Sequence, residues 1–140
     1  MLAATQIPGR VEHVEPRIKD MTSPNDDVVV VALGTNNVPT DSVGTCITKI
    51  GRVIDYTKRL NPDSRLVIPE IPHRFDRKEL NASIDKINQF IHHKCNKMDN
   101  TYSVRHDFTR GDYSADGLHL SYSGKVKYAR CIQDIVCKSD

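Results

Sequence analysis

The chain has 140 residues and a formal net charge of +2, from 20 basic and 18 acidic side chains mixed along the sequence. This length suits one domain, residues 1–140, with a core of its own. The near-neutral charge argues against nucleic-acid or anionic-membrane partners, and no segment approaches the ~20 apolar residues of a membrane span. We therefore expect a cytosolic protein.

Apolar residues near the N-terminus recur with helical spacing and lead into a run that predicts a strand. Val11, Val14 and Ile18 share one face of a predicted helix. The run VVVVALG, 28–34, is apolar without alternation. Such a strand needs cover on both faces, which is typical of a parallel sheet flanked by helices.

The middle of the chain repeats this alternation. Isoleucines at helical spacing predict a helix over 47–60, and RLVIPEIP predicts a strand over 65–72. Asp76 with Glu79 resembles a capping box, which would begin a helix carrying apolar residues over 80–91.

A third strand and a last helix complete the pattern. TYSVRHDF, 101–108, predicts a strand, and the polar segment 108–120 predicts a loop before a helix capped by Ser121. We expect the buried stripe of that helix to be Val126, Ala129, Ile132 and Val136.

Helices and strands in this order predict an α/β sandwich around a parallel sheet. Ligands of such sheets bind beyond the carboxyl ends of the strands. GTNN, 34–37, follows the first predicted strand and ADGLH, 115–119, follows the third. The two segments should therefore meet at one edge of the sheet and form a site there.

Asp116 and His119 have the spacing of an acid–base pair. An imidazole can shuttle a proton near neutral pH if a carboxylate fixes its tautomer, and Asp116 lies three residues before His119 in a turn. Such pairs also occur by chance in loops, so the spacing alone does not establish catalysis.

Asn36 follows the first predicted strand, where its amide could donate to a developing oxyanion. The alternative is that Asn36 and Asn37 only form a turn, because asparagine tolerates left-handed backbone and bonds its own main chain.

These segments together resemble the SGNH/GDSL hydrolases. VVVVALGTNN is similar to the family's third sequence block, DGLHLSYSG to the fifth and IPGR to the second, in family order along the chain. The spacing also resembles the esterase-like domain of LINE-type retrotransposon proteins. The resemblance implies a three-layer, flavodoxin-like sandwich that hydrolyses small esters with neither metal nor organic cofactor.

The resemblance also implies residue roles. His119 would be the general base, Asp116 its orienting acid, and Gly9 and Asn36 the oxyanion donors. Gly34, Thr35 and Asn37 would support the turn of the third block. Asn37 stands where the family has aspartate, so the hydrogen bonds of that carboxylate are expected to differ.

The family's nucleophilic serine block has no counterpart in this sequence. That serine precedes the glycine block, yet the first serine here is Ser23, and Thr5 is the hydroxyl upstream of Gly9. Ser114 fits a turn better than a nucleophile. We therefore expect a hydrolase domain with little or no activity as this chain; the alternative is a non-catalytic RNA- or protein-binding module derived from the same fold.

The family strand that carries this serine would be central in the sheet, so its absence predicts an open strand edge at 28–33. Unpaired N–H and C=O groups on such an edge invite pairing with another strand. Three occupants fit: residues 1–8, a second protomer in a homodimer, or a segment upstream of this sequence.

Two other polar segments have weaker interpretations. HHKC, 92–95, with His106 and Asp107 contains metal-ligating residue types, but the spacing matches no closed metal site, so a solvated helix end is favoured and no metal is expected. PHRFDRK, 72–78, could contact an anionic group or form a solvated loop. The four cysteines have no CxxC spacing and are expected to be reduced thiols.

Overall fold

The computed structural model describes residues 10–137. This part of the chain contains a three-stranded parallel sheet. The strands are β1 (Val28–Val30), β2 (Arg65–Pro69) and β3 (Thr101–Val104), in the spatial order β1-β2-β3. Because all pairs are parallel, the three carboxyl ends lie at the same edge of the sheet.

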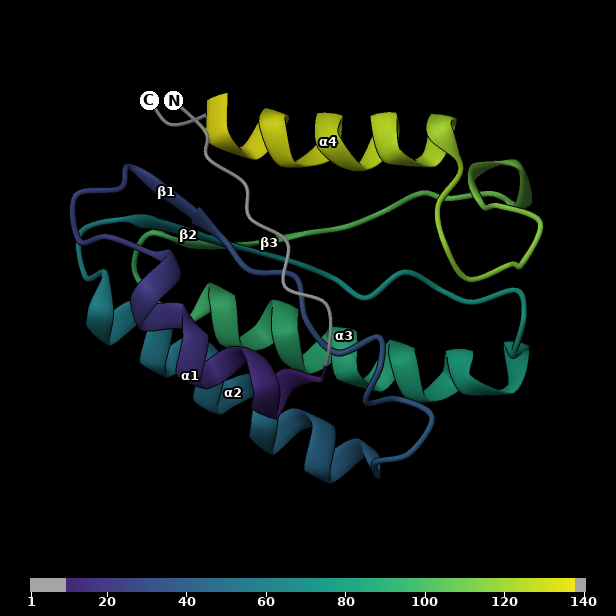
Figure 1. The fold of residues 1–140 in the computed structure, drawn as a ribbon, viewed down its shortest axis with the longest axis horizontal. Coiled ribbons are helices and arrows are strands. Elements are labelled where there is room, and N and C mark those ends of the chain that lie inside the picture. The colour runs from purple at the N-terminus through teal and green to yellow at the C-terminus, as the bar shows by residue number, and fades with distance from the viewer. Residues whose placement is uncertain (1–9, 138–140) are drawn as a thin grey trace.

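Helices cover both faces of this sheet, giving three layers (Figure 1). One layer holds α1 (Val11–Met21), α2 (Val43–Leu60) and α3 (Asn81–Asn96), and the other holds α4 (Tyr122–Cys137). This is the α/β sandwich with a parallel sheet that the sequence predicted. The short 3-10 helices η1 (Lys78–Leu80) and η2 (Arg110–Asp112) lie in the loops that follow β2 and β3.

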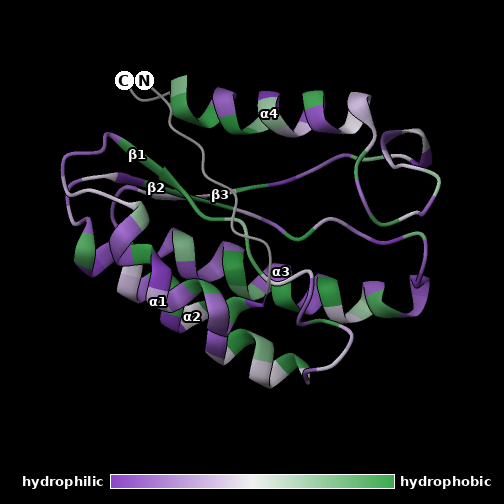
Figure 2. Ribbon diagram, viewed as in Figure 1, coloured by the Kyte–Doolittle hydropathy of each residue, from purple (hydrophilic) through white to green (hydrophobic). Residues whose placement is uncertain are grey.

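The larger hydrophobic core lies between the sheet and the layer of three helices. The apolar faces of these helices turn towards the sheet (Figure 2). The predicted face of α1 is confirmed, since Val11, Val14 and Ile18 are all buried. On the other face, Val67 and Val104 pack against Ile132 of α4 in a smaller core.

Strand β1 is shorter than its apolar run predicted. The ladder to β2 covers Val28–Val30, and the N–H of Val31 adds one hydrogen bond to the carbonyl of Val67, at 3.0 Å. The chain then leaves the sheet towards Gly34, whose φ of +102° suits a residue without a Cβ. Val31 and Leu33 are buried all the same, so burial rather than pairing explains the apolar run.

The predicted capping box is wrong. Asp76 instead receives two hydrogen bonds from the guanidinium of Arg74, at 2.9 and 2.7 Å, and Glu79 pairs with Arg77. The helix begins later, at Asn81, after η1. Each carboxylate therefore pairs with a nearby arginine instead of capping the start of the helix.

The last helix begins as predicted but buries a slightly different stripe. The Oγ of Ser121 accepts the N–H of Gly124 at 3.3 Å, which confirms Ser121 as the cap. Ile132 is buried and Val136 packs at its edge, whereas Ala129 is exposed. Within residues 10–137, no helix combines the length and the apolar composition needed to cross a membrane.

Candidate active site

Asp116 and His119 form a direct hydrogen bond in the loop between β3 and α4. Asp116 Oδ2 lies 2.6 Å from Nδ1 of His119, while Oδ1 accepts the backbone N–H groups of Leu118 and His119 at 2.9 and 3.0 Å. A carboxylate can only accept, so Nδ1 carries the proton and Nε2 is left as the acceptor. The His119 side chain is 76 % exposed, which leaves this imidazole open to solvent.

The same contacts keep Asp116 ionised. The hydrogen bond with His119, followed by the two backbone N–H groups, lowers the pKa of Asp116 to about 2. The carboxylate is therefore charged throughout the pH range in which an imidazole titrates. The pair has the orientation and charge that a general base with an orienting acid requires.

Main-chain contacts fasten this loop to the loop that follows β2. The carbonyl of Gly117 accepts the N–H groups of Phe75 and Asp76 at 2.8 and 3.3 Å. Gly117 has a φ of +71°, and a Cβ there would lie 2.8 Å from the backbone nitrogen of Asp76. Glycine at 117 is thus needed both for the turn and for the close approach. The position of the Asp116–His119 pair therefore depends on a contact between two loops.

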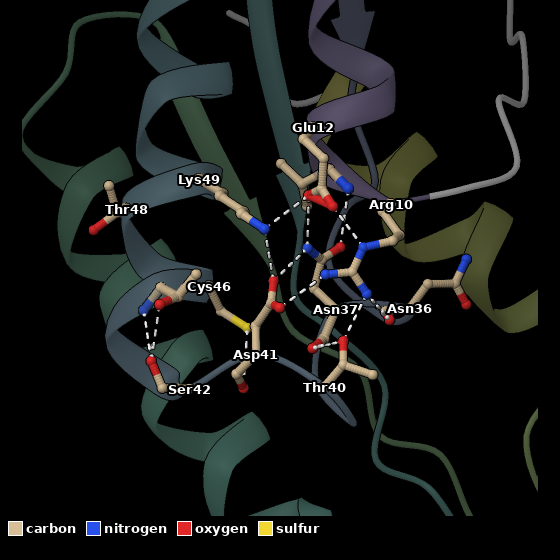
Figure 3. A network of polar contacts seen from close by, with 12 residues as sticks. Arg10, Glu12, Asn36, Asn37, Thr40, Asp41, Ser42, Cys46, Thr48 and Lys49 are labelled. Carbon is tan, nitrogen blue, oxygen red and sulfur yellow. Dashed lines mark hydrogen bonds and ion pairs between the residues drawn. The ribbon is translucent and has the colours of Figure 1, made fainter.

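Asn36 lies in the turn that follows β1. Its backbone carbonyl accepts a hydrogen bond from Nη1 of Arg10 at 3.3 Å, and its exposed side chain points away from the charged residues that surround Arg10 (Figure 3). Gly34 begins the turn, and its carbonyl accepts the N–H groups of Asn37 and Val38. Thr35 lies inside the same turn and is half-buried.

Asn37 is fully buried beneath this turn at the centre of a charged cluster, which we call the Asn37 cluster: Arg10, Glu12, Asn37, Asp41 and Lys49 (Figure 3). The Nδ2 of Asn37 donates to Glu12 at 3.0 Å and to Asp41 at 2.9 Å. Its Oδ1 accepts the N–H of Val11 at 2.9 Å, which ties the start of α1 to the turn. An aspartate could not make the two donated bonds.

Two cations complete the cluster. Arg10 pairs with Glu12 and Asp41, and Lys49 pairs with the same two carboxylates at 3.1 and 2.9 Å. The hydrogen bond from Arg10 is the main cause of a lowered pKa at Glu12, and that from Lys49 is the main cause of the lowering at Asp41, to about 2. Both carboxylates are therefore ionised at neutral pH.

The structure brings together one pair of the predicted site residues. Asp116 and His119 are in contact, whereas Asn36 follows β1, which β2 separates from β3. Neighbouring strands are ~4.8 Å apart, so the ends of β1 and β3 lie about 10 Å from each other across the same edge. Gly9 lies outside the described residues.

The serine hydroxyl groups nearest to His119 in sequence have structural partners. Ser114 Oγ donates to the carbonyl of Leu120, and Ser121 and Ser123 both donate to the carbonyl of Gly111. These contacts agree with a turn role for Ser114 and with a capping role for Ser121. The loop that carries the base thus presents no hydroxyl bonded to it.

A cavity of about 600 Å³, which we call the α3 cavity, lies between α3 and the segments that follow β2 and β3. Its lining includes Glu70, His92 and His106, but none of Asn36, Asp116 and His119. In the sequence both histidines are candidates only as metal ligands, and Glu70 belongs to no motif that would single it out. Among residues 10–137, no three or more His, Cys, Asp or Glu side chains are grouped to hold a metal ion.

His106 lies deep in this region, stacked between the rings of Phe108 and Tyr128 with centroids 4.8 Å away on each side. Both ring nitrogens are buried and have no hydrogen-bond partner in the described part of the chain. Burial lowers the pKa of His106, which favours the neutral ring. The aromatic sandwich, rather than a polar contact of the ring, orients this side chain.

No family model and no curated protein matches the sequence. Several solved structures share the fold. A family 3 carbohydrate esterase of Clostridium thermocellum matches with a TM-score of 0.70 and 21% identity over 94% of this chain and 69% of its own. A family 3 carbohydrate esterase of Talaromyces cellulolyticus matches with a TM-score of 0.73 and 18% identity, over 93% and 67% of the two chains.

A family two carbohydrate esterase of Clostridium thermocellum, in complex with cellohexaose, matches with a TM-score of 0.60 and 22% identity over 83% of this chain and 36% of its own. At these identities the likeness concerns the fold. All three structures also contain substantial segments that have no equivalent in this chain.

The Asn37 cluster predicts that an isosteric substitution at position 37 strongly lowers the free energy of unfolding. Asn37→Asp removes both donated hydrogen bonds and places a buried carboxylate beside the partly exposed carboxylates of Glu12 and Asp41. We expect a loss of roughly 3 kcal/mol of unfolding free energy at pH 7, measured by urea denaturation. Asn25→Asp, at an exposed turn, is the matched control and should change stability by less than about 0.5 kcal/mol. Equal effects of the two substitutions would show that the cluster does not depend on an amide.

The Asp116–His119 contact predicts a change in carboxyl titration. Removing the imidazole with His119→Ala should raise the pKa of Asp116 from about 2 towards its ordinary value of 3.8, because the first cause of the lowering is lost while the backbone N–H groups remain. Carbon-detected NMR of the Asp116 side chain measures this shift, and His13→Ala serves as the control. An unchanged titration would mean that the two side chains do not interact in solution.

Proposed function

We propose that this chain supplies the acid–base pair and the oxyanion donors of an SGNH-type ester hydrolase. The observation that carries the proposal is the Asp116–His119 hydrogen bond at the carboxyl edge of the sheet, with Nε2 left as the acceptor. The carbohydrate-esterase fold of the structural neighbours supports the same reaction class. The resemblance to the esterase-like domain of retrotransposon proteins remains a prediction from the sequence.

The reaction needs a seryl hydroxyl that the loop around His119 does not provide. In the proposed site the serine oxygen attacks the ester carbonyl carbon while His119 Nε2 takes the hydroxyl proton. The amide of Asn36 and the N–H of Gly9 stabilise the resulting oxyanion. His119 then protonates the departing alcohol, and water hydrolyses the acyl-serine by the reverse sequence of proton transfers.

A serine supplied on a neighbouring strand is the missing element of this proposal. A parallel strand beside β1 would end at the same edge as β1, β2 and β3, and its following turn would face the loop of His119. The chain by itself should therefore show no ester hydrolysis that depends on His119.

Adding that strand provides the test. A chimera with a strand and a Gly-Asp-Ser turn placed before residue 1 is expected to hydrolyse p-nitrophenyl acetate at a rate that depends on His119 and exceeds any turnover by the unmodified chain. Replacing the added serine with alanine, or His119 with alanine, should return turnover to background, a loss of at least 100-fold. A folded chimera that hydrolyses the ester no faster than the unmodified chain would refute the proposal and leave the non-catalytic binding module as the better interpretation.

We also infer that another strand covers the open edge of β1. Asp27 and Val31 bond to β2, so the alternate residues Val28 and Val30 direct their N–H and C=O groups to the opposite edge, where the described residues supply no strand. Such an edge favours pairing. Where no serine-bearing strand is added beside β1, a second copy of the chain is the occupant we propose.

Amide hydrogen exchange tests the pairing. If two copies pair through this edge, exchange at Val28 and Val30 should slow as protein concentration rises, in step with the dimer fraction measured by ultracentrifugation. Slow exchange at every concentration would instead indicate that a strand of the same chain pairs with the open edge of β1. Fast exchange at every concentration would show that no strand pairs there.

A further inference from the structure

A second chain of hydroxyl, imidazole and carboxylate groups lies beside the α3 cavity. Ser103 of β3 is hydrogen-bonded to Nδ1 of His92, which projects from α3. Nε2 of the same ring lies 2.8 Å from Oε2 of Glu70, the residue that follows β2. Three separate elements thus bring together the residue types of a nucleophile, a base and an orienting acid.

The partners determine which ring nitrogen carries the proton. A carboxylate can only accept, so opposite Glu70, Nε2 of His92 is the donor and Nδ1 is the acceptor. The hydroxyl of Ser103 therefore donates its proton to Nδ1. This is the protonation state that a general base needs. In the Ser-His-Asp triad Nε2 faces the serine and Nδ1 faces the carboxylate, whereas here Nδ1 faces Ser103 and Nε2 faces Glu70.

Glu70 is itself held in place. Its Oε1 accepts the backbone N–H of His106 at 2.8 Å, so each carboxylate oxygen has a partner. The side chains of His92 and Glu70 are only 12 % and 15 % exposed, so the surrounding residues limit the orientations that the imidazole ring can adopt. By contrast, His119 is 76 % exposed and depends on a partner in its own turn.

The α3 cavity gives this array a place for a ligand. His92 and Glu70 form part of its lining, together with Ile71 and the rings of Phe108 and Tyr113. Apolar and aromatic walls with a few fixed polar groups are typical of pockets for small organic molecules. A ligand in the cavity would meet the imidazole that holds the Ser103 hydroxyl.

We propose that Ser103 is a nucleophile for activated acyl and phosphonyl groups, with His92 as its general base and Glu70 as the positioning residue. The Ser103 oxygen bonds to the acyl carbon, the hydroxyl proton passes to Nδ1 of His92, and the bond to the leaving alcohol breaks as that proton returns to the alcohol. Water then attacks the acyl-serine, His92 takes its proton, and the carboxylic acid is released as Ser103 regains its hydrogen.

This array does not depend on the Asp116–His119 pair. Its residues come from β3, α3 and the segment after β2, and neither Asp116 nor His119 lines the α3 cavity. The two proposals therefore fail separately: one concerns turnover that depends on His119, and the other concerns modification that depends on His92.

Covalent labelling of the full 140-residue chain tests the proposal. The probe is a fluorophosphonate with a short alkyl chain: the Ser103 oxygen would bond to phosphorus, fluoride would leave, and His92 would take the proton. We expect peptide mass spectrometry to locate the adduct at Ser103. Because the unmodified protein is labelled, this result does not rely on the folding of a variant.

Variants then assign the roles. His92→Gln should slow labelling by at least 100-fold, whereas His13→Gln, at an exposed position of α1 outside the cavity, should leave the rate unchanged. Glu70→Gln should also slow labelling, and Glu70→Asp should restore part of the rate, since a carboxylate would be present again. Circular dichroism melts confirm that each variant is folded. Absence of an adduct at Ser103, or an equal rate in folded His92→Gln, would overturn the proposal.

Discussion

The parallel pairing of β1, β2 and β3 is the constraint on which the functional interpretation depends. Parallel strands end at the same edge, so the polar segments that follow them gather at one end of the molecule (Figure 1). The turn of Asn36, the segment of Glu70 and the loop of His119 all have this origin. A different strand direction would have placed one of them at the far end of the sheet.

The turn after β1 shows how a substitution within a motif can be offset by its surroundings. The sequence block that this turn resembles has aspartate at the position of Asn37, and here the amide lies between two carboxylates, Glu12 and Asp41, to which it donates. Arg10 and Lys49 balance those charges. The amide fits because the neighbouring side chains already supply the negative charge, so the turn that carries Asn36 is still held to α1.

The sequence predicted those features that depend on local pattern. Apolar periodicity identified α1 and the other helices, and the three-residue spacing of Asp116 and His119 predicted a contact that one turn can form by itself. The capping box failed because Arg74 and Arg77 compete for its carboxylates. The Ser103–His92–Glu70 array could not be predicted, because its members are 11 and 22 residues apart and meet only when α3 packs against the sheet.

The two imidazole–carboxylate pairs of this chain differ in how the fold supports them. The pair at 116 and 119 is local and exposed, so it forms wherever the turn forms, and its reactivity depends on what is placed opposite Nε2. The pair at 92 and 70 joins different elements and is half-buried, so tertiary packing fixes it and leaves Nδ1 directed at a hydroxyl within the same chain. The open base at 119 requires an added nucleophile, whereas the enclosed base at 92 already contacts one. The two pairs therefore differ in their chemistry, although each includes a residue from a segment that follows a strand of the same sheet.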